Sequence, residues 1–180
     1  MDAAVAPAPA DAARIDAAPA GLASWTVVRG DRLGAIARQA YGSAHYAAVI
    51  AAVNHVAPER LAVGAVLALP ALDHVVQGAI EPRAAALVAG VAGWSSARAA
   101  AWASRQDERD LAGAPLASIR QAADDLRQGA AALPRGAAAT GFRRAAAAMD
   151  VVAAGAAPAN GYDVDTVDRR LAEGIAALLR

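Results

Sequence analysis

Apolar residues between positions 25 and 70 follow a strand-like pattern, then two helical patterns, then a second strand-like pattern. Residues 25–28 are aromatic and β-branched, and the turn-forming residues 29–31 end this first strand. Two amphipathic helices are expected next, because apolar positions recur three and four residues apart. These positions are Leu33, Ile36, Ala37 and Ala40, followed by Tyr46, Val49, Ile50 and Val53. With a closing strand at 66–69, the pattern predicts a βααβ unit over residues 25–70 whose outer strands pair antiparallel.

Capping residues mark the ends of these two helices. Asp31 is expected to cap the start of the first helix, and Ser43 the start of the second. Gly42 follows the first helix and suits a left-handed C-cap, because it has no Cβ to clash there.

The remainder of the chain is predicted to be helical. Residues 71–79 are interpreted as a linker, and residues 80–180 carry helical apolar spacing. The inward positions expected in four successive helices are Ile80, Ala84, Leu87, Val91, Trp94 and Ala101 or Trp102; Leu116, Ile119, Ala123, Leu126, Ala130 and Leu133; Phe142, Ala145, Met149 and Val152; Val167, Leu171, Ile175 and Leu178. The predicted fold is therefore mainly α, with a small α+β (βααβ) unit followed by an alanine-rich bundle of three to four helices.

Residues 1–24 are rich in alanine, proline and aspartate, a composition typical of a disordered tail or linker. They lack the basic cluster and uninterrupted apolar run of a secretory signal. We therefore expect a cytoplasmic or particle-associated protein, or one at the cell envelope if another route exports it.

Composition narrows the function classes. All 17 basic residues are arginine, and 17 acidic residues balance them to a formal net charge of zero. Nucleic-acid binding is not expected, because no basic surface is evident in the sequence. No apolar run reaches the roughly 20 residues needed to cross a bilayer, so no membrane span is expected.

The residues that could suggest a catalytic or metal-binding site are better explained as parts of helix breaks, helix caps and the core. The glycines at 136 and 141 have the spacing of a phosphate loop, but Phe142 replaces its lysine. His45, His55 and His74 lie in different expected elements, without metal-ligand spacing. Asp165 is interpreted as a helix N-cap, with Asp168 in the first turn. Trp94 and Trp102 are interpreted as core anchors, an exposed docking patch being the alternative. We expect no enzyme activity, no cofactor and no metal site.

Residues 25–70 resemble the LysM family. The residues that carry the resemblance are Trp-Thr-Val-Val-Arg-Gly-Asp-Arg-Leu at 25–33, Ile36-Ala37, Tyr41-Gly42, Ile50, Asn54, Pro58-Glu59-Arg60-Leu61, Val63-Gly64 and Val66-Leu67-Ala68-Leu69-Pro70. They occur in family order and at family spacing, which makes the likeness specific. The likeness covers this segment only, and no family is suggested for the helical half.

The resemblance implies a shallow groove that binds N-acetylglucosamine polymers, such as peptidoglycan, between the loops at 30–33 and 56–61. Apolar walls formed by Leu33, Val56 and Leu61 would contact the acetamido methyl groups. The glycan-binding residues implied are Gly30, Asp31, Arg32, Leu33, Val56, Ala57, Pro58 and Leu61. Arg32 and Gly34 depart from the family pattern, and a long Arg32 side chain would cover the groove or bind a carboxylate.

A second class of function stays open. One LysM copy alone is usually a weak binder, and modules of this type also serve as assembly joints in phage-tail-like contractile injection particles. The helix ending at Tyr41-Gly42, followed by Tyr46 and the 58–61 loop, is similar to that longer subtype. A tail or baseplate protein is the partner this alternative implies, with self-association through the helical half as a further possibility and a role as carried effector ranked third.

Overall fold

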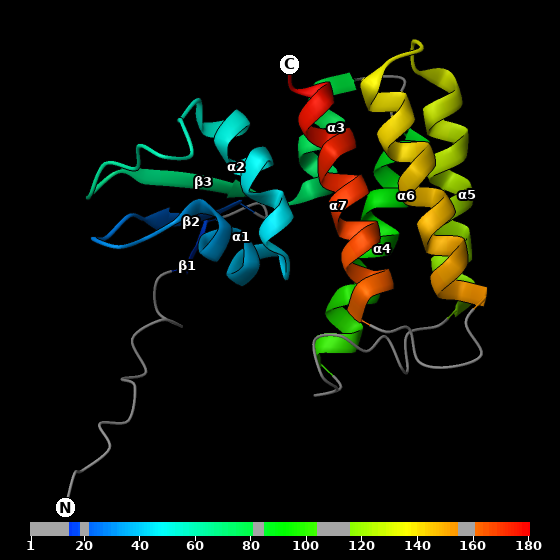
Figure 1. Ribbon diagram of the computed structural model, residues 1–180, viewed down its shortest axis with the longest axis horizontal. Coiled ribbons are helices and arrows are strands. Elements are labelled where there is room, and N and C mark those ends of the chain that lie inside the picture. The colour runs from blue at the N-terminus through cyan, green and yellow to red at the C-terminus, as the bar shows by residue number, and fades with distance from the viewer. Residues whose placement is uncertain (1–14, 19–21, 81–84, 104–115, 155–160) are drawn as a thin grey trace, which may run out of the picture.

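The computed structural model describes residues 15–18, 22–80, 85–103, 116–154 and 161–180. A three-stranded sheet and two short helices lie beside a group of longer helices (Figure 1). The prediction of a mainly α protein with a small α+β unit is confirmed. Within the described residues, no helix combines the length and hydropathy needed to cross a membrane.

The N-terminal unit contains the predicted βααβ order. Its elements are β2 (Leu22–Thr26), α1 (Leu33–Tyr41), the 3₁₀ helix η2 (Ala44–Tyr46), α2 (Ala47–Asn54) and β3 (Val66–Pro70). Strands β2 and β3 pair antiparallel, with Trp25 opposite Leu67. Trp25 and Leu67 are both buried, so this pair joins the sheet to the core beneath the helices.

Two expectations about segments outside this unit were wrong. Strand β1 (Ile15–Ala18) lies in the predicted tail and pairs antiparallel with β2, making the sheet order β1-β2-β3. Backbone hydrogen bonds to β2 suffice for this pairing, and they leave no hydrophobic pattern in the sequence. The predicted linker at 71–79 is largely helix α3 (Leu72–Ile80), because Leu72, Val75 and Val76 share one face and are buried.

The helical half consists of α4 (Ala85–Ala103), α5 (Leu116–Ala132), α6 (Ala137–Ala154) and α7 (Gly161–Leu178). These helices pack in chain order, α4 on α5, α5 on α6 and α6 on α7, while α3 packs on α4. The predicted inward positions of α6 are all buried, as are most of those in α5 and α7. Leu116 is the main exception, at 42% exposed. The predicted positions Ala84, Ala101 and Trp102 lie outside the residues whose side chains the structure describes.

The predicted caps were right for Gly42 and Ser43 and wrong for the two aspartates. Gly42 has φ 78° and its N–H donates to the Arg38 carbonyl, while Ser43 Oγ accepts from the N–H of His45. Arg32, not Asp31, occupies the N-cap position of α1. Asp165 caps nothing, because α7 begins four residues earlier at Gly161.

Candidate functional site

The first predicted glycan-binding loop, residues 30–33, forms a tight turn between β2 and α1. Gly30 has φ 96°, a left-handed conformation that favours glycine. Asp31 Oδ2 accepts hydrogen bonds from Trp25 Nε1 and from the N–H of Val28, both at 2.9 Å. The Asp31 carboxylate is therefore tied to the turn itself, a role that the capping prediction missed. Its function is to hold the loop in place.

The side chains at the end of this loop point in opposite directions. Arg32 is exposed, whereas Leu33 is only 3% exposed and belongs to the core. Leu33 therefore cannot serve as an open wall of a groove. Any ligand at this loop would meet Gly30, Arg32 and the backbone.

In the second predicted loop, residues 56–61, some side chains are likewise partly buried and others are exposed. Val56 and Leu61 are partly buried and pack against the core, whereas Ala57 and Pro58 are exposed. The N–H of Val56 donates to the Ala51 carbonyl at 3.1 Å, which anchors the loop at the end of α2. Both loops lie at the end of the N-terminal unit that points away from the helical half (Figure 1).

Asn54 joins helix α2 to strand β3 beside this second loop. Its Nδ2 donates to the carbonyl oxygens of Ile50 and Ala68, and its Oδ1 accepts from the N–H of Ala68 at 2.7 Å. One side chain thus satisfies both backbone groups of Ala68 on the outer edge of the sheet. This protects the edge from pairing with another strand.

We expect Asn54→Ala to lower the free energy of unfolding by about 1–2 kcal/mol, because it removes several partly exposed hydrogen bonds at once. Urea denaturation followed by circular dichroism measures this change. His55→Ala is not a suitable control, since His55 has φ 53°. Ala57→Ser, in the exposed part of the same loop, should leave the midpoint unchanged, and an equal loss in both variants would contradict the structural role of Asn54.

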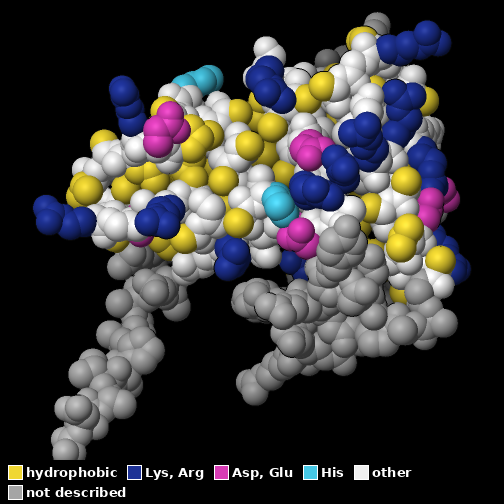
Figure 2. Space-filling model, viewed as in Figure 1, with side chains coloured by type: hydrophobic (Ala, Val, Ile, Leu, Met, Phe, Trp, Pro, Cys, Tyr) yellow, Lys and Arg dark blue, Asp and Glu magenta, His cyan; other side chains and the backbone are white. Residues whose placement is uncertain are grey.

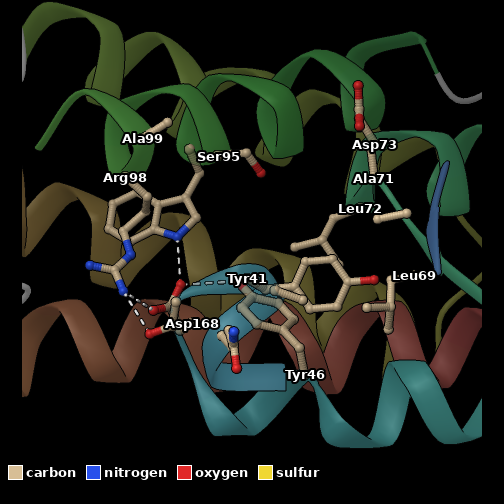
Figure 3. Close-up of a pocket in the computed structure, with 15 residues that line it drawn as sticks. Tyr41, Tyr46, Leu69, Ala71, Leu72, Asp73, Ser95, Arg98, Ala99 and Asp168 are labelled. Carbon is tan, nitrogen blue, oxygen red and sulfur yellow. Dashed lines mark hydrogen bonds and ion pairs between the residues drawn. The ribbon is translucent and has the colours of Figure 1, made fainter. Parts of the chain in front are cut away.

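A pocket of about 420 Å³ lies where the N-terminal unit meets the helices (Figure 3). Tyr41, Leu69 and Leu72 form apolar walls on one side, and Trp94, Ser95 and Ala99 of α4 line the other. The Tyr41 hydroxyl donates to the Pro70 carbonyl at 2.9 Å, and the Tyr41 and Tyr46 rings meet edge to face.

A buried carboxylate lies at the base of this pocket (Figure 3). Asp168 of α7 is 1% exposed, and its Oδ1 accepts from Trp94 Nε1 at 2.7 Å and from the Tyr46 hydroxyl at 3.0 Å. Its Oδ2 lies 3.3 Å from Arg98 Nη2, which also donates to the Gly42 carbonyl at 3.1 Å. The cluster of Tyr46, Trp94, Arg98 and Asp168 joins η2, α4 and α7, which are far apart in the sequence.

Burial dominates the electrostatics of this cluster. It raises the pKa of the Asp168 carboxyl, while Arg98 and the hydrogen bonds from Trp94 and Tyr46 oppose that rise. Burial, together with the neighbouring Asp168 carboxylate, raises the pKa of the Tyr46 phenol well above its ordinary value. Burial also raises the pKa of the Tyr41 phenol. Both tyrosines are therefore neutral donors at physiological pH.

The geometry suits a structural role for Asp168. A perturbed carboxyl beside a pocket is a typical candidate for acid–base chemistry, but here both carboxylate oxygens already have partners in the protein. Reaching a bound molecule would require breaking those contacts. The cluster instead gives each oxygen of the buried Asp168 carboxylate a partner, which offsets the cost of removing its charge from water.

From the sequence, Asp168 was expected in the first turn of a helix, and it was not connected with Tyr46 or Trp94. A signal was present, because Val167 and Leu171 mark the inward face of α7 and Asp168 adjoins it. Trp94, predicted as a core anchor, is 1% exposed and confirms that interpretation.

The three histidines do not come together. His45 Nε2 pairs with Asp165 Oδ1 at 2.9 Å, across the boundary between η2 and α7, whereas His55 and His74 are exposed elsewhere. Within the described residues, no three histidine, aspartate or glutamate side chains are grouped as metal ligands would be.

Comparison of the chain with protein-family models, curated proteins and solved structures finds no match.

Proposed function

We propose that this chain is a non-catalytic binding protein whose LysM-like N-terminal unit binds a glycan containing N-acetylglucosamine, most favourably peptidoglycan. The observation that supports the proposal is the βααβ arrangement of β2, α1, α2 and β3, with the loops at 30–33 and 56–61 both on the side away from the helical half. The helical half leaves this end uncovered, so a long polymer has access to it.

The contacts in this proposal differ from those expected of an apolar groove. Exposed Arg32, Ala57 and Pro58, together with backbone groups of both loops, meet the sugar. Asp31 and Leu33 act indirectly, Asp31 by holding the turn and Leu33 by anchoring the loop in the core. Backbone donors and acceptors suit the neutral acetamido group, which requires no charge or metal.

We expect Ala57→Glu to weaken retention of the full chain on insoluble peptidoglycan at least tenfold, because an added carboxylate in the loop repels the acidic polymer and blocks the sugar. A co-sedimentation assay measures retention. Ala131→Glu adds the same charge at an exposed position on α5 and should bind normally. Equal retention by the Ala57 variant and the wild type would remove this loop from the site.

Titration of the full chain with short N-acetylglucosamine oligomers, followed by amide NMR, locates the contact surface. The full chain is needed because residues 25–70 alone would expose Tyr46, which is buried against the helices. Shifts confined to residues 30–33 and 56–61 would support glycan binding. Shifts elsewhere, or none at millimolar ligand, would contradict it.

Protein docking, as in the assembly of a contractile injection particle, is the second candidate. Val63 and Val66 favour it, because they are 68% and 64% exposed at the same free end of the unit. Exposed apolar side chains near each other are typical of protein contact surfaces. Changing both to serine should leave glycan titrations unaltered if the two loops alone bind sugar, and should abolish assembly with a tail or baseplate protein if docking is the function.

A further inference from the structure

Three exposed arginines lie at the two loops of the proposed glycan site. Arg29 directly precedes the loop at 30–33, Arg32 lies within it, and Arg60 belongs to the loop at 56–61. Over the described part of the chain, none of the three guanidinium groups forms an ion pair with a carboxylate. Figure 2 shows basic side chains at this end of the N-terminal unit, away from the helical half.

The acidic side chains of the N-terminal unit do not balance this charge. Residues 22–70 contain four arginines against one aspartate and one glutamate, an excess of two positive charges in a chain whose formal net charge is zero. The aspartate is Asp31, whose Oδ2 accepts hydrogen bonds from Trp25 Nε1 and the Val28 N–H and so faces the turn. The outer surface of the two loops is therefore positive.

Recognition of acetamido groups makes no use of these arginines. An acetamido group is neutral, whereas a guanidinium binds carboxylates through charge-assisted, often paired, hydrogen bonds. The arginines also need not converge on a single oxyanion if the ligand is a strand that carries carboxylates at intervals, because each guanidinium then meets a different one. Charge complementarity of this kind contributes to specificity more than to affinity.

We propose that the N-terminal unit prefers an acidic glycan, in which N-acetyl sugars are accompanied by carboxylates, over neutral polymers of N-acetylglucosamine. The inference rests on the proposed function, because it concerns the same two loops. Backbone groups of the loops bind the acetamido groups, and Arg29, Arg32 and Arg60 bind carboxylates along the same strand. Peptidoglycan meets this requirement, and chitin, which has no carboxylates, is the poorer ligand.

The test is a titration of the full chain with matched oligosaccharides, followed by amide NMR. The acidic oligomer alternates N-acetylglucosamine with N-acetylmuramic acid, and its neutral counterpart has the lactyl carboxylates amidated. We expect the acidic oligomer to bind at least about fivefold more tightly at low salt, and added sodium chloride to reduce the difference, because salt screens exposed charges.

A further oligomer separates the two sources of carboxylate in peptidoglycan. Attaching peptides to the lactyl groups consumes the sugar carboxylates and places new ones at the peptide ends. Tighter binding of this oligomer than of the peptide-free acidic one would assign the arginines to the peptides. Weaker binding would assign them to the sugar.

Variants distinguish the loops from general charge attraction. The combined change of Arg29, Arg32 and Arg60 to glutamine should abolish the preference for the acidic oligomer and leave affinity for the amidated one unchanged. Arg38→Gln is the matched control, because it removes the same charge from an exposed position in the last turn of α1. It should keep the preference, and an equal loss in this variant would overturn the role of the loops.

Failure of the inference is distinguishable from failure of the proposed function. Equal affinity of the wild type for the acidic and amidated oligomers would overturn the preference and leave glycan binding intact. No shift with either oligomer would overturn both.

Discussion

Replacing Asp168 with alanine is expected to lower the free energy of unfolding by about 3–5 kcal/mol, the usual loss when one partner of a buried ion pair is removed. The change leaves Arg98 as a partly buried cation without this carboxylate, and it deprives Trp94 Nε1 and the Tyr46 hydroxyl of their acceptor. Urea denaturation followed by tryptophan fluorescence measures it directly, because Trp94 contacts the altered residue.

Asp124→Ala is the matched control, because the Asp124 side chain is 69% exposed and its ion pair with Arg127 lies on the surface. Exposed pairs of this kind contribute roughly 0–1 kcal/mol. Similar losses in the two variants would show that the Asp168 cluster does not hold the two halves together.

The pH dependence of stability gives an independent measurement of the same cluster. Because the pKa of Asp168 is raised in the folded protein above its ordinary value of 3.8, folding favours the protonated carboxyl. The stabilisation that protonated Asp168 gives the folded state is fully present below pH 3.8 and is lost as pH rises through the folded pKa. Over that interval, the free energy of unfolding of the wild type should therefore fall relative to that of Asp168→Asn. A difference that stays constant from pH 3.5 upward would contradict the raised pKa.

The N-terminal unit was predictable because each of its helices and strands is marked by residues within a short stretch of sequence. The aromatic and β-branched residues at 25–28 mark a strand, although β2 begins earlier, at Leu22, and ends at Thr26. The glycine at 42 marks the end of α1, and the apolar spacing around Ile36 and Ile50 marks the two helices. Strand β1 was not predictable, because Ile15–Ala18 contains two alanines and an aspartate, and only β2 makes it a strand. Helix α3 was predictable in principle, since Leu72, Val75 and Val76 already have helical spacing.

The candidate site was less accessible from sequence than the fold. A resemblance places loops, but it cannot show that Leu33 is buried while Arg32 is exposed. The Asp168 cluster depends on residues up to 122 positions apart, such as Tyr46 and Asp168, and no local pattern records such a contact. The same holds for the pocket beside Asp168, which exists only where the N-terminal unit meets α4.

Replacing Gly141 with alanine is expected to lower the free energy of unfolding by at least about 3 kcal/mol, at the upper end of the usual loss on overpacking. A Cβ at Gly141 would lie 2.6 Å from the Gly174 Cα and 2.7 Å from its nitrogen, so it would meet backbone and not a side chain that can turn away. Helices α6 and α7 would have to separate, which opens the core around Phe142. Urea denaturation followed by circular dichroism measures the loss.

Gly78→Ala is the matched control, because it makes the same change in helix α3 where no atom lies within 4 Å of the new Cβ. It should raise the free energy of unfolding by up to about 1 kcal/mol, since alanine favours helix more than glycine does. Opposite signs for the two variants would show that glycine at 141 serves close helix packing. Stabilisation by both would contradict the close approach of α6 and α7 at Gly141 and Gly174.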